Sequence, residues 1–175
     1  MTQRVKSSQG IRNNLRNEND PYLLPKGMGM KEPLRCKDCG LIYWNKRWYQ
    51  EQEAKRLYGS KKIQGEVKCP ACRKRADNVP MGLVTLEGSF LRDHTEEIFN
   101  LIRNEEQKVM NHNPLDRIVQ VKKTKKGIEI TTTTERLAQR LGKAVHRAYS
   151  GDLHYSFSDD VKFARVQWVR ENNTE

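Results

Sequence analysis

Four cysteines in two matched pairs are the residues whose type and spacing most clearly predict chemistry in this chain. They lie in the segments Cys36-Lys-Asp-Cys39 and Cys69-Pro-Ala-Cys72, so both pairs have the spacing C-x-x-C. Two residues between the thiols let each pair close a tight turn, and four sulfurs complete the tetrahedral shell of a structural zinc site. We therefore predict one structural Zn²⁺ bound by Cys36, Cys39, Cys69 and Cys72.

These thiols have alternative uses as two disulfides, as four unrelated thiols or as the ligands of an iron–sulfur cluster. A redox C-x-x-C needs only one pair in a thioredoxin-like strand–helix context, which the sequence lacks. The repeated spacing, with no fifth cysteine left over, favours zinc.

No pattern in the sequence predicts a catalytic centre. Four cysteines fill every position of a tetrahedral zinc, and no P-loop, GxGxxG or G-x-S-x-G segment occurs. The segment Asn111-His112-Asn113 resembles part of a zinc-stapled nuclease site, but no second histidine follows at the required position. We therefore expect a protein that is not an enzyme and has no small-molecule substrate, with a nuclease as the remote alternative.

The charge of the chain predicts a polyanionic partner. The net charge is +11, and it is unevenly distributed: residues 36–75 carry eleven basic and four acidic groups, whereas residues 76–113 carry three and seven. A surface charged only for solubility would not segregate in this way, and nucleic acid is the commonest polyanion that proteins meet. The sequence has no apolar run of about 20 residues and no signal peptide, so we expect a cytoplasmic protein without a membrane partner.

The elements that must position the cysteines divide the chain into four segments. We expect an extended basic arm over 1–33, a zinc-binding knuckle module over 34–76, a linker strand and acidic helix over 77–113, and an α+β domain over 114–172. The predicted fold class is α+β, with a zinc-ribbon-like module followed by an α-ββ-α-ββ domain.

Within the zinc module, the sequence predicts a strand at 41–44, a helix from Glu51 to Tyr58 that stops at Gly59, and a strand at Val67. Trp44 and Trp48 are four residues apart, and we expect at least one of them to form the small core over the zinc.

Further along the chain, we predict a strand over 82–88 and a helix over 93–113 that opens with a capping box of Asp93 and Glu96. A basic-tipped hairpin over 117–133, a helix capped by Thr134 and a last pair of strands to Trp168 follow.

Basic side chains close to aromatic ones are typical of single-stranded RNA binding, because aromatic faces stack on bases while Lys and Arg neutralise phosphates. The predicted RNA contacts lie in the zinc module and on the hairpin tip: Lys46, Arg47, Trp48, Lys61, Lys62, Arg73, Lys74, Arg75, Lys122, Lys123, Lys125 and Lys126.

Several short segments occur together with the cysteine pairs: Arg47-Trp48, Leu101-Ile102-Arg103-Asn104, Pro114-Leu115-Asp116-Arg117-Ile118, Glu129-Ile130-Thr131-Thr132-Thr133 and Leu137-Ala138-x-x-Leu141-Gly142-Lys143-Ala144. Together they resemble small bacterial proteins related to the archaeal and eukaryotic NMD-three family, the ribosomal large-subunit export adaptor. The resemblance covers most of residues 34–170 and implies zinc knuckles, a following α+β domain and binding to ribosomal RNA on the large subunit. Longer members have four knuckles and further domains with export signals, so the resemblance does not imply nuclear export for this chain.

Taken together, these features predict a non-enzymatic, zinc-containing RNA-binding protein that associates with the ribosome as an assembly or dormancy (hibernation) factor. We expect ribosomal RNA or a ribosomal subunit as its partner and a monomer away from the ribosome. The alternatives are a zinc-ribbon DNA-binding or transcription-associated protein, and a protein–protein adaptor that uses the acidic helix.

Overall fold

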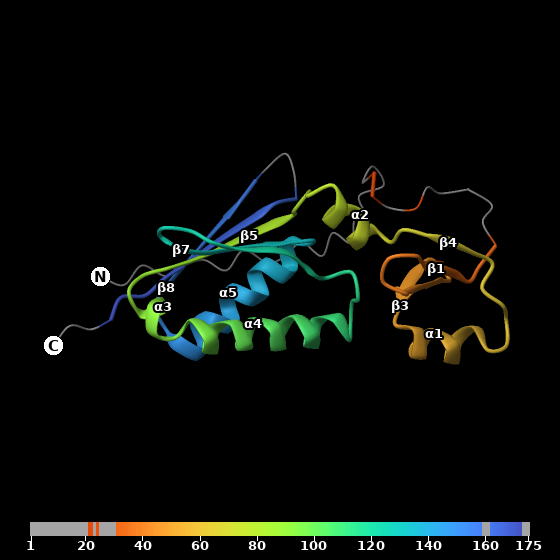
Figure 1. Cartoon of the computed structure of the whole chain (residues 1–175), viewed down its shortest axis with the longest axis horizontal. Coiled ribbons are helices and arrows are strands. Elements are labelled where there is room, and N and C mark those ends of the chain that lie inside the picture. The colour runs from red at the N-terminus through yellow and green to blue at the C-terminus, as the bar shows by residue number, and fades with distance from the viewer. Residues whose placement is uncertain (1–20, 23, 25–30, 159–161, 173–175) are drawn as a thin grey trace, which may run out of the picture.

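The computed structural model describes residues 21–22, 24, 31–158 and 162–172. It contains two mixed sheets with their own helices, which confirms the predicted α+β class. The smaller sheet and the cysteines lie at one end of the molecule, and the larger sheet with its covering helices lies at the other (Figure 1).

The smaller sheet consists of four short strands in the order β3-β2-β1-β4. These are β1 (Leu34–Cys36), β2 (Ile42–Trp44), β3 (Arg47–Tyr49) and β4 (Gly65–Val67). β1 is antiparallel to β2 but parallel to β4, and the last pair in the parallel register is Cys36 with Val67. Because both strands end at the same edge, the parallel pairing brings the chain that follows Val67 to Cys36.

Two helices belong to this end of the chain. Helix α1 (Glu51–Tyr58) ends at Gly59, which adopts φ 63°, a conformation that glycine reaches without strain. This end point is the one that the sequence predicts. Ala54 of α1 packs with Ile42 of β2 in a small buried cluster, which holds the helix against the sheet. Helix α2 (Pro70–Ala76) follows β4 directly.

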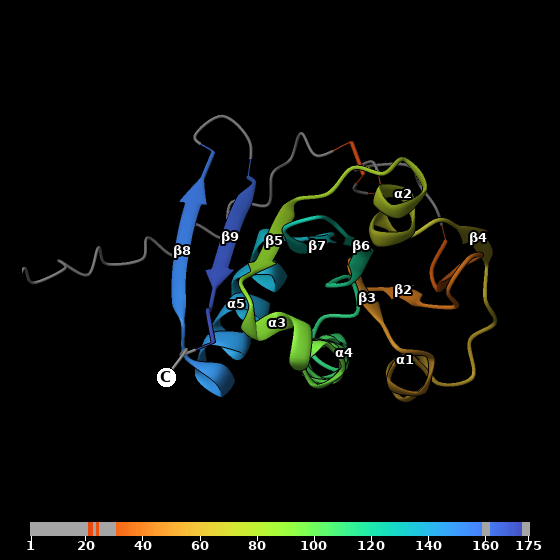
Figure 2. The same ribbon diagram turned by 60° about the vertical axis from the view of Figure 1, so that its left-hand side comes forward.

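The larger sheet has five strands in the order β6-β7-β5-β9-β8. They are β5 (Gly82–Glu87), β6 (Ile118–Lys123), β7 (Gly127–Thr132), β8 (Asp152–Phe157) and β9 (Ala164–Val169). Figure 2 shows β5 between the β6–β7 hairpin and the β8–β9 hairpin.

The central position of β5 corrects the division of the chain that the sequence predicts. Segment 77–113 is not a linker, because β5 pairs with β7 antiparallel and with β9 parallel along its full length. Its side chains alternate between buried and half-buried positions, with Val84 and Leu86 fully buried. β7 and β9 follow much later in the chain, so no local pattern in the sequence indicates that β5 pairs with them. The order of the elements along the chain therefore does not predict the central position of β5.

Helices α3 (Phe90–Asp93), α4 (Thr95–Met110) and α5 (Glu135–Tyr149) complete this part of the fold. Figure 1 shows α4 and α5 beneath one face of the sheet. Buried side chains of the sheet and of these helices form the main core: Val84, Leu86, Phe90, Leu91, Ile98, Ile102, Val109, Ile128, Ile130, Leu137, Ala138, Leu141, Val145, Val166 and Trp168.

The predicted cap of α5 is confirmed, whereas that of α4 is wrong. The Thr134 hydroxyl accepts a hydrogen bond from the Leu137 N–H at 3.3 Å. Helix α4 instead begins after a separate short helix, its cap residue is His94, and Asp93 accepts a hydrogen bond from the Asn172 side chain. The capping-box spacing occurs by chance here, because Asp93 belongs to the preceding helical turn.

Most of the predicted arm over 1–33 lies outside the described residues, but its last part is placed on the small sheet. Leu24 packs against the buried cysteine cluster, and the Asn45 N–H donates to a Glu32 carboxylate oxygen at 2.6 Å. In the described part of the chain, no helix combines the length and apolar character needed to cross a membrane.

Candidate metal centre

The four cysteines form one cluster, in which the four Sγ atoms lie within 4.8 Å of one another. Cys36, Cys69 and Cys72 are buried and Cys39 is half-buried. None of them forms a disulfide, so four thiol ligands from two distant segments converge on one point. The cluster is a candidate metal centre with a complete set of four protein ligands.

The first ligand pair lies on a tight turn at the end of β1. The Gly40 N–H donates to the Cys36 carbonyl oxygen at 2.9 Å, and the Cys36 N–H donates to the Leu41 carbonyl oxygen at 2.7 Å. Gly40 adopts φ 75°, which closes the turn without strain from a side chain. These contacts point Cys36 and Cys39 in the same direction, as the C-x-x-C spacing predicts.

The second ligand pair is built differently from the first. Cys69 is the N-cap of α2, and Pro70 occupies the first helical turn, where its missing N–H costs nothing. The Cys72 N–H donates to the Cys69 Sγ at 3.4 Å, as in an N-cap whose acceptor is sulfur. The two pairs are therefore not equivalent, because a tight turn supplies the first pair and a helix start supplies the second. Pro70 directly after a capping position was the sequence signal for this helix.

Contacts between the two pairs set the ionisation of the thiols. Cys39 Sγ lies 3.7 Å from Cys69 Sγ, and this hydrogen bond lowers the pKa of Cys39 to about 4. The same contact, together with burial, raises the pKa of Cys69 above its ordinary value. Burial also raises the pKa of Cys72 to about 12. Metal ligands must be deprotonated, so a bound cation would favour the thiolate forms of Cys69 and Cys72.

A small apolar core surrounds the cysteines and includes Trp48, whose side chain is 9% exposed. Tyr43 packs on Trp48 with 5.2 Å between the ring centroids. The prediction that a tryptophan covers the metal site is thus confirmed for Trp48. Its predicted role as an RNA contact is wrong for this conformation, because a buried ring has no free face for a base.

The predicted phosphate contacts of the zinc module divide into exposed and buried residues. Lys46 and Arg47 are exposed at the turn between β2 and β3, where Asn45 and Lys46 both adopt positive φ angles. This two-residue turn is typical of a tight hairpin. Lys61 and Lys62 are exposed after α1, and Arg75 is exposed on α2.

Lys74 is the exception among these residues. Its side chain is buried, with 8% exposed, and its Nζ lies 5.7 Å from the centroid of the Tyr22 ring. Its predicted phosphate contact is therefore wrong for this conformation, because residues 22 and 24 of the preceding segment cover this side of the module. Arg73 on the same helix is half-buried.

The hairpin lysines lie far from the zinc module. Lys122, Lys123, Lys125 and Lys126 are exposed at the tip of the β6–β7 hairpin, which lies at the opposite end of the larger sheet from the cysteines (Figure 1). The sequence thus predicted two basic regions, and the fold separates them. Sequence reasoning missed Ser89, Arg92 and Glu171, which lie with the hairpin tip around one pocket.

The loop between α4 and β6 connects the larger sheet to the metal centre. Leu115 packs against the cysteine cluster, and the charge of Arg117 contributes to the lowered pKa of Cys39. The Arg117 side chain is buried and donates to the Pro114 carbonyl oxygen at 2.9 Å. This loop is therefore part of the surroundings of the candidate metal centre.

Comparison of the chain with protein-family models and with curated proteins finds no match. The resemblance to the NMD-three family accordingly stays a prediction.

Proposed function

We propose that this protein is a non-enzymatic, zinc-containing RNA-binding protein that associates with the ribosome in the cytoplasm. The observation that carries the proposal is a set of exposed or half-buried cations on the zinc module that form no ion pair with any acidic side chain in the described part of the chain.

Zinc is the ion that the ligand set favours. A tetrahedral site with Zn–S bonds of about 2.3 Å requires sulfur atoms about 3.8 Å apart. The Cys39–Cys69 sulfur separation of 3.7 Å matches this requirement. Four thiolates also leave no open position, as expected for a structural ion. The ion would therefore hold β1 and α2 together and take no part in a reaction.

Some cations of the zinc module are held in ion pairs, and others are not. Arg35 and Lys55 pair with Glu51, and Lys68 pairs with Asp38. By contrast, a second group forms no ion pair with any residue that the structure describes: Lys46, Arg47, Lys61, Lys62, Arg73 and Arg75. Cations without protein counter-charges are free to neutralise phosphates, and releasing the counterions of RNA drives such binding.

Trp44 adds a partly exposed aromatic ring to this basic surface. The Lys61 Nζ lies 4.4 Å from the centroid of the Trp44 ring, and Tyr58 supports the ring from within the module. Trp44 is thus the residue of the zinc module that fits the base-stacking role predicted for Trp48.

The acidic helix is less available to a protein partner than its sequence predicts. Glu105 of α4 pairs with Lys108 and Arg140, and Glu106 accepts a hydrogen bond from the Ile118 N–H at 2.6 Å. These two carboxylates therefore hold the fold together, which weighs against the adaptor alternative.

Co-sedimentation with ribosomal subunits tests the proposal. We expect the wild-type protein to sediment with the large subunit at moderate salt and to be released as the salt concentration rises, because phosphate contacts are salt-dependent. Reversing Lys46, Arg47, Lys61 and Lys62 to Glu should abolish co-sedimentation while leaving the zinc content unchanged.

A charge-matched control separates a specific contact from a general loss of positive charge. Arg103 on α4, Lys143 and Arg147 on α5 and Arg165 on β9 are exposed. Reversing all four to Glu changes the charge as much as the test variant does and should leave co-sedimentation largely intact. Preference for duplex DNA over ribosomal RNA in competition would overturn the proposal in favour of a DNA-binding protein. A protein partner retained through high salt and nuclease treatment would favour the adaptor.

A further inference from the structure

A pocket of about 520 Å³ lies between the β6–β7 hairpin tip and the turn that follows β5. The hairpin contributes residues 123–128, and the turn and the start of the following helices contribute residues 87–89, 91–92 and 95. Val169 and Glu171 from the end of β9 close the third side.

Glycine is required in both turns that form this pocket. A Cβ on Gly88 would lie 2.0 Å from the carbonyl oxygen of Arg170. A Cβ on Gly127 would lie 1.9 Å from the carbonyl oxygen of Leu86. Backbone segments from β5, β7 and β9 therefore approach closely, and this fixes the walls of the pocket. A rigid backbone frame distinguishes the site from a loose group of surface lysines.

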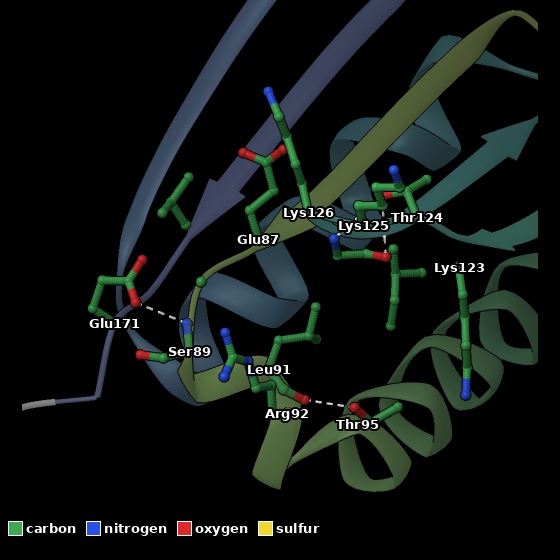
Figure 3. Close-up of a pocket in the computed structure, with 14 residues that line it drawn as sticks. Glu87, Ser89, Leu91, Arg92, Thr95, Lys123, Thr124, Lys125, Lys126 and Glu171 are labelled. Carbon is green, nitrogen blue, oxygen red and sulfur yellow. Dashed lines mark hydrogen bonds between the residues drawn. The ribbon is translucent and has the colours of Figure 1, made fainter.

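The pocket is rich in cations that are not held in ion pairs. Arg92, Lys123, Lys125 and Lys126 line it, and none of them forms an ion pair with any residue in the described ranges. Figure 3 shows the Arg92 side chain between the hairpin tip and the Ser89–Glu171 contact, with Lys123 on the far side of the pocket above α4. Two acids, Glu87 and Glu171, also line it, so the four cations remain in excess.

One wall of the pocket already holds an oxyanion. The Ser89 N–H donates to a Glu171 carboxylate oxygen at 2.8 Å, while the Ser89 Oγ accepts from the Asn172 N–H at 2.7 Å. Hydrogen bonding from Ser89 and the charge of Arg92 lower the pKa of Glu171. The Glu171 side chain is exposed and lies at the end of the last strand, so it can leave the wall without disturbing the core.

We propose that this pocket binds a phosphate group of RNA, which displaces the Glu171 carboxylate from Ser89 and contacts Arg92 and the hairpin lysines. Phosphate offers more acceptor oxygens and more negative charge than a carboxylate, and the guanidinium group binds it in a bidentate manner. Glu171 then acts as a resident competitor that the ligand replaces. The inference rests on the proposed function only in identifying RNA as the source of the phosphate.

The source is either a 5′-terminal phosphate or a phosphodiester of the RNA backbone, and matched oligonucleotides distinguish the two. The probe is a ten-nucleotide single-stranded RNA of one sequence, prepared with a 5′-phosphate and with a 5′-hydroxyl, and binding is followed by fluorescence anisotropy. We expect Arg92→Ala to weaken binding about tenfold, as for loss of a charge-assisted hydrogen bond. An effect on both oligonucleotides identifies a backbone phosphodiester, and an effect on the phosphorylated one alone identifies the terminus.

Two further variants test the resident carboxylate and the location of the site. Glu171→Gln should strengthen binding about threefold, because it removes a competing negative charge. Glu135→Gln, at the opposite end of the sheet, should leave binding unchanged. Arg103 is two turns beyond Thr95 on α4 and outside the pocket, so Arg103→Ala is the control for Arg92→Ala.

Inorganic phosphate provides a test that is independent of RNA. We expect it to shift the amide resonances of Ser89 and Gly127, and potassium chloride at equal ionic strength should not. The inference would be overturned if Arg92→Ala and Arg103→Ala bound both oligonucleotides with equal affinity. It would also be overturned if phosphate caused no specific shift of the amide resonances. Either result would count against the pocket even if ribosome binding is found. Phosphate shifts that depend on Arg92 in a protein that fails to sediment with ribosomes would support the pocket and contradict the proposed function.

Discussion

The backbone N–H of Cys69 donates a hydrogen bond to the Sγ of Cys36 across 3.2 Å. This contact joins the start of α2 to the end of β1, which are separated in the chain by β2, β3, α1 and β4. This N–H points at the Cys36 sulfur, so the fold itself places the second cysteine pair beside the first. Ion binding in turn holds the two segments together.

The zinc module should therefore lose its structure when one ligand is removed. We expect Cys36→Ser to abolish zinc binding and to unfold residues 34–76, because structural zinc supplies folding free energy in small domains. The larger sheet has its own buried core and should remain folded. Metal analysis together with amide hydrogen exchange measures both effects.

Chelation of the wild-type protein provides the control, since it removes the ion without changing a side chain. It should reproduce the hydrogen-exchange pattern of Cys36→Ser, and added Zn²⁺ should reverse it. Unchanged protection of residues 34–76 in the variant would show that the apolar core around Trp48 suffices without metal.

Asp116 is a second point at which the fold depends on one buried group. Its side chain is fully buried and accepts hydrogen bonds from Asn113 at 2.9 Å, Thr134 at 3.0 Å and Arg136 at 2.9 Å. Asp116→Asn would place an amide group among these donors. We expect a loss of roughly 2 kcal/mol in the free energy of unfolding, the typical effect of leaving buried polar groups unsatisfied.

Chemical denaturation measures this loss for the larger domain. Asp152→Asn is the matched control, because Asp152 is exposed at the start of β8 and should change stability by no more than about 0.5 kcal/mol. Equal midpoints for the two variants would mean that the buried network contributes nothing net.

Local patterns predicted the single elements well, and the reason is that their signals are local. The cysteine spacing, the Gly59 stop of α1 and the Thr134 cap of α5 each depend on a few neighbouring residues, and all three are found in the structure. Ile98 and Ile102 of α4, four residues apart and therefore on one face of the helix, are both buried.

The remaining features depend on contacts between distant segments, which no local pattern encodes. The central place of β5, the burial of Lys74 beneath the preceding segment and the separation of the two basic regions are all of this kind. The pocket is the clearest case, because Ser89 and Glu171 meet across 82 positions of the chain. Their contact could not be read from residue types.

Gly142 gives a sharp test of how closely α5 packs on the sheet. A Cβ at this position would lie 2.3 Å from the Val166 Cγ1. At an exposed helix position, replacing glycine by alanine stabilises the helix by about 1 kcal/mol. In a packed core, however, an extra methyl group costs about 1–3 kcal/mol. We expect Gly142→Ala to lower the midpoint of thermal unfolding.

Lys143→Ala is the control for this substitution, because Lys143 is exposed on the same helix and should leave the midpoint nearly unchanged. A higher midpoint for Gly142→Ala would mean that α5 can shift away from β9 and accommodate the methyl group.

Glu105 should make the contact between α4 and α5 sensitive to acid. The Lys108 ammonium donates to one Glu105 oxygen at 2.7 Å and the Arg140 guanidinium to the other at 3.0 Å, and both lower the pKa of Glu105 below its ordinary value of 4.5. A carboxylate whose pKa is lowered by folding stabilises the native state above the unfolded-state pKa. This stabilisation is lost as the pH falls through the lower pKa of the folded state.

We therefore expect Glu105→Gln to lower the free energy of unfolding at pH 7 by about 0.5–1 kcal/mol, since Lys108 and Arg140 are both largely exposed to solvent. The difference from the wild type should shrink as the pH falls below 4.5 and Glu105 becomes protonated in both states. Urea denaturation at several pH values measures it, with the exposed Glu96→Gln as the control on the same helix. If the difference in the free energy of unfolding stayed constant with pH, Glu105 would act through packing. An effect of its charge must disappear when the carboxylate is protonated, whereas an effect of packing does not.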